Sequence, residues 1–253
     1  MVKEKEWSYS KLYSFNKCKH QFKLIYIDKV TPRPSLSTQL LETAHKAINT
    51  AISYGATTSR LNDMYVNFWN YSGLIKVGDD ERLITFFNSL REKIAQELYT
   101  FRELGDVQYI DYPTEFLISK NAVYRDSVDA VTLGADGHMY FFKWRLGQKP
   151  SDSVNEMAML FLDTETDPLL QKAPRLGIVK NLSGKKTYKV LNTRLNNDTA
   201  LRWVYDTIDR VEEEEEFAPR LTTTNKKENE VYCTHGCEVS HMCQIRKKIL
   251  VDE

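Results

Sequence analysis

Four cysteines are the residues of this chain whose type and spacing most directly suggest chemistry. Cys233, Cys237 and Cys243 fall within one short polar segment near the end of the chain, and Cys18 lies near its start. A single buried cysteine often fills space in a core, but three thiols in one polar segment would fill a core poorly. Four thiolates suit either an iron–sulfur cluster or a tetrahedral zinc ion. The spacing therefore predicts a metal centre that ties the last segment to the first.

Two histidines keep another ligand set open at the same place. His235 and His241 lie among the three tail thiols, so a zinc site with three cysteines and one histidine is an alternative. Two disulfides are a further alternative, but disulfides are rare in the cytosol. We expect a cytoplasmic protein, because the opening MVKEKEWSYS lacks the apolar stretch of a signal peptide. No membrane contact is expected either, since no run approaches the roughly 20 apolar residues of a spanning helix.

The charge balance limits how the chain can bind nucleic acid. Its 253 residues include 35 basic and 35 acidic side chains, and 42% of them are hydrophobic, which is enough for a substantial core. A protein that coats nucleic acid through charge alone is strongly basic, so any groove for DNA must be a local patch. The candidate contacts are basic residues and two aromatic residues that could stack on bases: Lys17, Lys19, Lys23, Lys143, Arg145, Lys149, Lys185, Lys186, Tyr140 and Trp144.

Helical periodicity dominates the first hundred residues. Residues 7–30 predict a helix that carries Cys18, and residues 38–55 predict a second helix that carries His45. The apolar spacing in residues 61–104 is that of two further helices in ordinary bundle packing.

Alternation of apolar and polar residues replaces this pattern after Gly105. Three antiparallel strands are predicted within residues 107–147, with a hairpin turn through Ala135 and Asp136. We expect Glu115, Asp129 and Lys143 to lie on adjacent rungs of these strands. Later segments predict a helix, a hairpin and a last helix that ends in five solvated glutamates: residues 151–165, 173–192 and 199–217.

Several of these pieces together resemble one family. The segment SYSKLYSFNKCKHQFKLIYI is similar to the first helix of RecB-like nucleases of the PD-(D/E)XK superfamily. The resemblance is strongest to the iron–sulfur branch, which includes the CRISPR-associated RecB-like exonucleases and the AddB nuclease domain. In that branch one early cysteine joins three near the carboxy terminus to hold a 4Fe–4S cluster. The resemblance implies this role for Cys18, Cys233, Cys237 and Cys243, although the family's C-x2-C-x5-C is C-x3-C-x5-C here.

The resemblance also implies a fold. The expected class is α/β, with a restriction-endonuclease-like mixed sheet flanked by helices and a cluster that joins the termini. Residues 1–253 would form a single domain. Within it we expect a helical insertion at 38–104, the sheet core at 105–195 and the cluster-binding tail at 231–245.

The family's active-site pattern is only partly present. The resemblance implies catalytic roles for His45, Glu115, Asp129 and Lys143, with His45 and Asp129 as ligands of Mg²⁺ or Mn²⁺. The acid that should stand two residues before the lysine is Phe141. Two further departures follow: Glu42 replaces the glycine that precedes the family histidine, and Met157–Phe161 lacks both polar groups of the family's Gln-x-x-x-Tyr.

These departures predict weakened metal binding. Mg²⁺ needs near-octahedral oxygen ligation, so His45 and Asp129 alone would hold it weakly, and Mn²⁺ would tolerate the imidazole better. We therefore expect a degenerate site with little or no catalysis. The alternative is that a carboxylate on another element replaces the missing one, and its candidates are Glu115, Asp126, Asp136 and Glu156.

The function implied by the resemblance belongs to DNA processing, defence or counter-defence. We expect an iron–sulfur nuclease-fold protein that binds DNA, single-stranded or at ends, or the protein partners of a DNA-processing or CRISPR complex. One alternative is an active metal-dependent exonuclease on single-stranded DNA. The other is a zinc-binding interaction module unrelated to nucleases.

Overall fold

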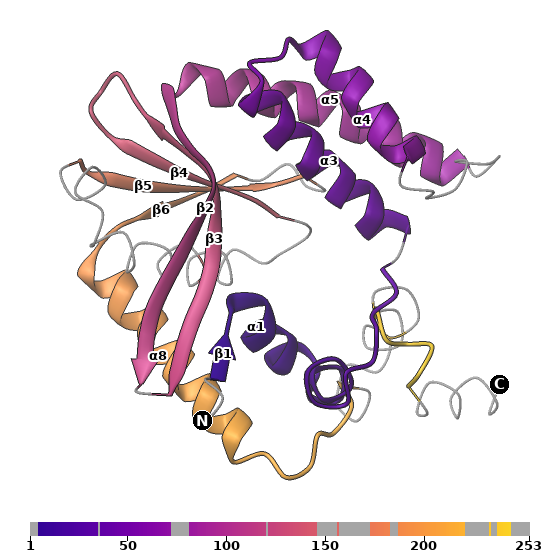
Figure 1. The fold of residues 1–253 in the computed structure, drawn as a ribbon, viewed down its shortest axis with the longest axis vertical. Helices are drawn as coiled ribbons and strands as arrows, with labels where there is room; N and C mark the ends of the chain where they lie inside the picture. Colours follow the sequence, from indigo (N-terminus) through magenta and orange to yellow (C-terminus); the bar gives the residue numbers. More distant parts are fainter. Residues whose placement is uncertain are drawn as a thin grey trace. The chain divides into compact units, whose positions relative to one another are not determined.

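The protein is described here as a computed structural model with an α/β fold (Figure 1). The structure describes residues 5–34, 36–71, 81–119, 121–145, 156, 173–182, 187–220, 233 and 237–243. The chain divides into two compact units. The first comprises residues 1–6 and 36–201, and the second comprises residues 7–35 and 202–253.

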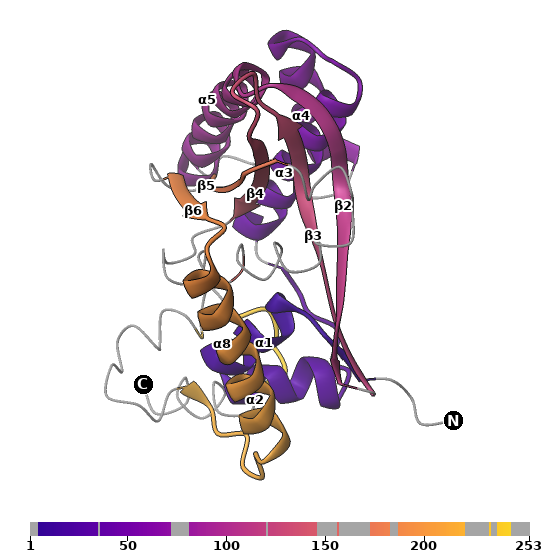
Figure 2. The same cartoon turned by 90° about the vertical axis from the view of Figure 1, so that its left-hand side faces the viewer.

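A mixed sheet is the centre of the first unit. In the described part of the chain it has six strands, in the order β1-β3-β4-β5-β6, with β2 also paired to β3. The β2–β3, β3–β4 and β5–β6 pairs are antiparallel, and β4 and β5 are parallel. The strands are β1 (Lys5–Trp7), β2 (Asp106–Ser119), β3 (Ala122–Leu133), β4 (Met139–Arg145), β5 (Arg175–Asn181) and β6 (Thr187–Leu191). Figure 2 shows β2 and β3 as a long hairpin.

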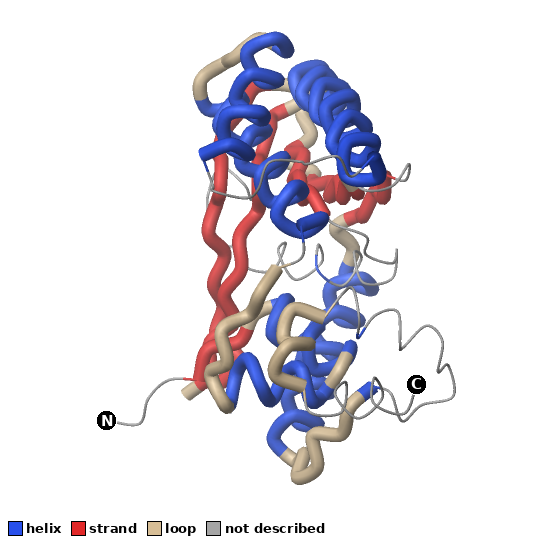
Figure 3. Tube along the Cα trace, turned by 90° about the vertical axis from the view of Figure 1, so that its right-hand side faces the viewer, coloured by secondary structure: helices blue, strands red, loops and turns tan. Residues whose placement is uncertain are grey.

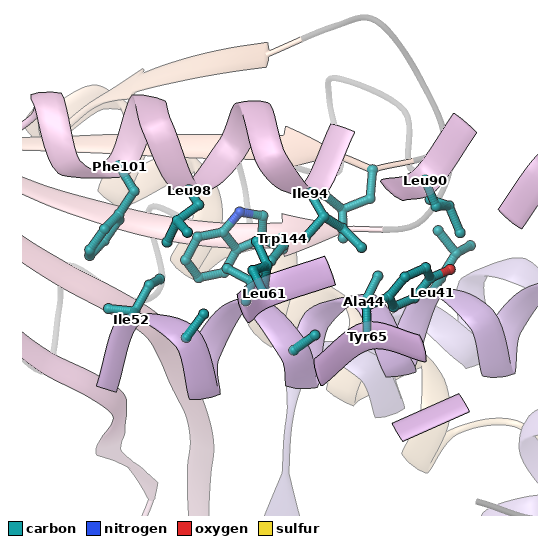
Figure 4. Packing of buried hydrophobic residues seen from close by; sticks show 14 of the residues in the cluster. Leu41, Ala44, Ile52, Leu61, Tyr65, Leu90, Ile94, Leu98, Phe101 and Trp144 are labelled. Carbon is teal, nitrogen blue, oxygen red and sulfur yellow. The ribbon is translucent and has the colours of Figure 1, made fainter. Parts of the chain in front are cut away.

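Three helices cover one face of this sheet. They are α3 (Leu36–Ser53), α4 (Thr58–Tyr71) and α5 (Glu81–Glu103). Their buried residues recur every three or four positions, so each helix presents an apolar stripe, and those stripes pack on Phe142 and Trp144 of β4. Figure 4 shows the indole of Trp144 among side chains of these helices. Strand β4, which carries Lys143, is thereby packed against helix α3, which carries His45.

The opposite face of β4 packs into a second apolar cluster. Phe141 is completely buried there. Its neighbours come from β3, β4, β5 and β6: Val128, Val131, Met139, Val179 and Val190. Successive strand residues point to opposite faces, so the alternation of β4 between the two clusters also places Lys143 and Arg145 on the face of Phe141.

A cysteine breaks the first helical segment of the second unit. The single helix predicted for residues 7–30 is instead α1 (Tyr9–Lys17), α2 (Lys19–Phe22) and the π-helix η1 (Lys23–Ile27). Cys18 has extended backbone angles, and its sulfur accepts from the backbone N–H of Gln21 as the N-cap of α2. Periodicity missed this break because the apolar stripe continues through it.

The last helix, α8 (Arg194–Glu212), contributes its residues from Arg202 onward to the second unit. There Trp203 packs on Tyr9 with ring centroids 5.4 Å apart. Asn16 of α1 is held by two contacts with α8: its amide lies 3.3 Å from the Thr207 hydroxyl, and Arg210 donates to its oxygen at 3.0 Å. Figure 3 traces these segments in blue as helices.

The predicted class of a mixed sheet flanked by helices is confirmed, as are the three antiparallel strands from residue 107 onward. The helix predicted for 151–165 is described only at Glu156, and the Met157–Phe161 segment lies outside the described residues. The single domain predicted for 1–253 stays a prediction. None of the described helices is both long enough and apolar enough to span a lipid bilayer.

Candidate functional site

Lys143 is the centre of a buried group of charged side chains on the sheet. Its ammonium nitrogen lies 2.9 Å from Asp126 Oδ1, 3.9 Å from Asp129 Oδ1 and 3.9 Å from Glu156 Oε1. It also donates to the backbone carbonyl of Ser127. Lys143 is 2% exposed. A lysine this deeply buried stays charged only when anions surround it closely, which is the case here.

The sheet register sets the pairing of Asp129 with Lys143. Ala130 lies opposite Phe142 in the antiparallel β3–β4 pair, so Asp129 and Lys143 share the next rung. The backbone N–H of Trp144 donates to Asp129 Oδ2 at 2.6 Å, which holds that carboxylate in place. His45 Nε2 lies 3.6 Å from the same oxygen. This geometry brings His45, Asp129 and Lys143 together, and the catalytic roles expected of them stay predictions.

Arg145 and Glu156 form the second half of the group. The Nε atom of Arg145 donates to Glu156 Oε2 at 2.8 Å, and its Nη2 atom donates to Glu156 Oε1, so the pair is bidentate. Glu156 is 1% exposed. A bidentate arginine–carboxylate pair fixes both position and orientation more tightly than a lysine contact does. The sequence offered a signal for Arg145, since strand periodicity places it on the face of Lys143.

Burial and opposing charges shift the pKa values in this group. Burial raises the pKa of Glu156 to about 7, and the charge of Arg145 opposes that rise. Burial likewise raises the pKa of Asp129, against the opposing effects of Arg145, His45 and the Trp144 N–H. Burial alone would lower the pKa of Arg145, but the charges of Glu156 and Asp129 raise it above its ordinary value. Arg145 is therefore a permanent cation in this site.

The register of β2 contradicts the expected position of Glu115. Glu115 lies opposite Arg125, four residues from Asp129 along β3, rather than on the rung of Asp129. It is exposed and accepts from Arg125 Nε at 2.6 Å. The prediction failed because residue spacing alone does not specify how two long strands are aligned.

Asp111 occupies the rung that was expected for Glu115. Ile110 pairs with Ala130 and Tyr112 pairs with Val128, so Asp111 stands opposite Asp129. It has a φ of 50°, which Asp tolerates better than most residues. Asn49 of α3 donates to Asp111 Oδ1 at 2.7 Å, and the same amide nitrogen lies 3.3 Å from His45 Nε2. Sequence reasoning missed both residues.

The described residues do not fit a divalent metal ion at this site. No group of three or more His, Cys, Asp or Glu side chains among them is arranged to hold a metal. Phe141 occupies the position where the resemblance places an acid, and it is completely buried in apolar surroundings. Lys143 and Arg145 already pair with the acids nearest to them. The ligand roles predicted for His45 and Asp129 are therefore not supported by the arrangement of their neighbours.

One cavity of the second unit has cysteines from both ends of the chain in its lining. Cys18, Cys233, Cys237 and Cys243 all line it, together with apolar side chains such as Leu24. The tail is anchored beside this cavity, because the backbone N–H of Arg33 donates to the carbonyl of Glu238 at 2.7 Å. Val239 is buried at the same place. Thiols from both ends of the chain therefore line one cavity.

The donor set and the cavity volume give different answers about a cofactor. The thiols are not close enough together to share one ion. In an iron–sulfur cluster each thiolate binds a different iron, so its sulfurs stand further apart than around a single zinc. Four cysteine thiols are the ligand set of such a cluster. The cavity volume is about 20 Å³, close to the space of one water molecule, so a cluster would have to displace the tail outward.

The thiols of this cavity repel one another when ionised. Burial, followed by the charges of Cys18, Cys237 and Cys243, raises the pKa of Cys233 to about 11. Burial also raises the pKa of Cys237. Thiolates that are shifted in this direction need added positive charge to form at neutral pH, which bound metal supplies.

Two of the candidate DNA contacts, Lys143 and Trp144, are buried. Trp144 is 3% exposed and packs within the helical core, so it cannot stack on a base. Lys143 and Arg145 pair with the acids described above. Lys19 pairs with Glu214 and Lys23 with Asp28, whereas Lys17 lies over the Tyr13 ring. The Tyr140 hydroxyl donates to Asp136 at 2.6 Å. Three predicted contacts lie outside the described residues: Lys149, Lys185 and Lys186.

Comparisons with known proteins give a distant likeness of fold. No model of a protein family matches the chain, and no curated protein matches it. Among solved structures, the crystal structure of SSO0001 matches with a TM-score of 0.43 and 10% sequence identity. The match covers 97% of this chain and 89% of that one. At this level the likeness carries no argument about function.

Proposed function

We propose that this chain is a RecB-like nuclease-fold protein that has lost metal-dependent cleavage. It would act in DNA processing or defence by binding DNA or a nuclease complex. The observation that carries the proposal is the placement of Phe141. It lies on the same face of β4 as Lys143, two residues away, where the resemblance calls for a metal-binding acid, and it is completely buried among valines. A benzyl ring offers no oxygen ligand, and Mg²⁺ requires oxygen ligands.

The remaining parts of a nuclease site support the fold relationship. Asp129 and Lys143 share a rung of neighbouring strands, and His45 approaches Asp129 from a helix. This arrangement fits the motif positions on which the resemblance rests. The acids around Lys143 lie close to the basic side chains of Lys143 and Arg145, which supports the loss of metal binding.

We also propose that Cys18, Cys233, Cys237 and Cys243 bind a 4Fe–4S cluster as a structural cofactor. The shared cavity supports it, because thiols from both ends of the chain line the same space. A metal centre that joins distant segments contributes its binding free energy to folding. Loss of one ligand should therefore release the tail from the N-terminal helices of the second unit.

The experiment for the cleavage proposal uses labelled single-stranded and double-stranded DNA with excess Mg²⁺ or Mn²⁺. We expect no cleavage above the background of the Asp129→Ala variant, while fluorescence anisotropy detects binding of the same DNA. Metal-dependent cleavage that disappears in Asp129→Ala would contradict the proposal. It would favour the active exonuclease instead, with Glu156, 3.9 Å from Lys143, as the replacement acid.

The experiment for the cluster uses anaerobically purified protein. We expect a brown protein with a broad absorption band near ~400 nm, as thiolate-ligated iron gives, and loss of that band in Cys18→Ser. Stoichiometric zinc in a colourless protein would contradict the cluster and favour the zinc module. The sequence offers His235 and His241 as further ligands for that module, and His20 lines the same cavity.

A further inference from the structure

A second cavity lies at the edge of the sheet where β4 and β5 begin and β6 ends. Its volume is about 540 Å³, within the range of pockets that hold small-molecule ligands. The residues that line it all belong to the first unit. Lys143 and Arg145 lie further along β4 and are not among the described residues of its lining. This cavity is therefore separate from the group of charges around Lys143.

One rung across three strands gives the cavity an apolar surface. Tyr140 of β4 pairs with Leu176 of β5, which pairs with Leu191 of β6, so the three side chains share one face of the sheet. All three line the cavity. The next rung on that face, Phe142 with Ile178, is buried in the helical core, whereas Leu191 is 59% exposed. The helical cover of the sheet therefore ends at this rung.

The turn before β4 holds the Tyr140 ring in place. The Tyr140 hydroxyl donates to Asp136 Oδ2 at 2.6 Å, and the backbone N–H of His138 donates to Asp136 Oδ1 at 3.1 Å. A Cβ atom at Gly134 would lie 2.5 Å from Asp136 Oδ1 and 2.6 Å from the Tyr140 ring, so glycine is what lets this carboxylate and this ring pack so closely. The ring is fixed before any ligand binds, which lowers the entropy cost of binding.

The rim of the cavity offers hydrogen-bond donors and a positive charge. Arg175 lines it, and the planar guanidinium of an arginine is permanently charged and matches the oxygens of a phosphate. Oδ1 of Asn192 accepts from Asn197 at 2.9 Å, so the amide N–H groups of Asn192 are the ones that can donate to a ligand. Thr193 adds a hydroxyl. The described residues that line the cavity include no acidic side chain, so the rim favours an anion.

We propose that this cavity binds a nucleotide, with the base on the Tyr140 ring and the phosphate on Arg175. Bases of every kind stack on aromatic side chains, and arginine pairs with phosphate through two parallel hydrogen bonds. Free nucleotides and the phosphorylated end of single-stranded DNA both present this chemistry. The inference goes beyond the proposed function, because it assigns a ligand to a part of the sheet away from Lys143 and holds whether or not cleavage is lost.

The experiment titrates the full-length protein with thymidine monophosphate, with inorganic phosphate and with a terminally phosphorylated thymidine tetranucleotide, by isothermal titration. We expect saturable binding of the monophosphate that weakens at least about tenfold in Tyr140→Leu, which keeps an apolar contact without the ring, and in Arg175→Gln. Arg125→Gln removes an arginine of the same sheet that pairs with exposed acids, Glu6 and Glu115, and should bind as the wild type does.

The tetranucleotide separates the two sources of the ligand. Affinity equal to or above that of the monophosphate supports the inference with a DNA end as the ligand. Weaker binding of the tetranucleotide supports it with a free nucleotide as the ligand.

The remaining outcomes overturn the inference. They are no saturable binding by the wild type, unchanged affinity in either Tyr140→Leu or Arg175→Gln, an equal loss in Arg125→Gln, and inorganic phosphate that binds as tightly as the nucleotide. A dimer that binds no nucleotide and that Leu191→Asp dissociates would assign the exposed leucine to a second copy of the chain, and it would also overturn the inference.

A direct readout on the wild-type protein covers the case in which a variant does not fold. Methyl NMR signals of Leu176 and Leu191 should shift when thymidine monophosphate is added, and unchanged signals would overturn the inference. DNA cleavage by the wild type would contradict the proposed function and leave this inference standing.

Discussion

Asn49 donates a hydrogen bond of 2.7 Å to Asp111 Oδ1, and this bond joins helix α3 to strand β2 beside His45. Asn49 is 8% exposed whereas Asp111 is exposed, so the bond is only partly shielded from water. Asp111 holds a φ of 50°, a conformation that costs energy for most residues. The bond therefore both orients the amide near His45 and stabilises an unfavourable backbone geometry.

Replacement of Asn49 should expose that role. Asn49→Ala leaves Asp111 without this donor, and we expect the free energy of unfolding to fall by about 1–2 kcal/mol in urea titration. Asp111→Asn is the matched control, since asparagine tolerates positive φ and retains an acceptor oxygen. If Asn49→Ala unfolds at the same urea concentration as the wild type, the bond contributes nothing measurable.

Glu156 should make the protein less stable as pH rises through the acidic range. Its pKa is about 7 in the folded protein and near the ordinary 4.5 when unfolded, so between these values the folded state binds more protons. The free energy of unfolding should then decrease with rising pH by up to about 1.4 kcal/mol per pH unit and level off above pH ~7.

The substitution Glu156→Gln tests this assignment, because it removes the ionisable group and should flatten the slope. Some slope of the same sign will remain, since burial also raises the pKa of Asp129 and of Glu97. Glu115→Gln, an exposed carboxylate on β2, serves as the control and should keep the wild-type slope. An undiminished slope in Glu156→Gln would assign the effect to other acids.

Replacement by alanine should lower the free energy of unfolding by different amounts at two glycines with positive φ. A Cβ atom at Gly105 would collide with the backbone of Leu133 and Gly134, where β2 begins beside the end of β3. A Cβ atom at Gly55, φ +60°, meets nothing within 4 Å. We expect Gly55→Ala to cost about 1 kcal/mol through its backbone conformation alone.

Gly105→Ala adds a steric clash to that conformational cost. It should lower the free energy of unfolding by about 3 kcal/mol or more, because the backbone at the start of β2 must shift. Thermal unfolding of both variants provides the comparison. Equal losses for the two would show that the β2–β3 junction accommodates the methyl group.

Local patterns in the sequence were sufficient to predict the helix and the strands around the site. The periodicity of residues 38–55 predicted the helix that carries His45, and alternation after Gly105 predicted β2, β3 and β4. These predictions succeed because side-chain direction repeats every 3.6 residues in a helix and every two in a strand. The same rule places Phe141 and Lys143 on one face of β4.

These patterns did not predict how the elements align with one another. The register of β2 with β3 puts Asp111, and not Glu115, opposite Asp129. A strand pattern with period two is compatible with several registers, and only packing against α3 and β4 selects one. The N-capping role of Cys18 was hidden for a similar reason, because the apolar stripe runs unbroken across it.

The sequence by itself determined which residue types are present for chemistry: four cysteines at the two ends of the chain, an acid and a lysine on adjacent strands, and a phenylalanine two residues before that lysine. Only the tertiary structure decided how their charges are balanced. Arg145 reaches Glu156 from a different segment, and Lys143 contacts three carboxylates drawn from β3 and from the Glu156 segment. Burial makes such pairings obligatory, and burial depends on the complete fold rather than on any local pattern.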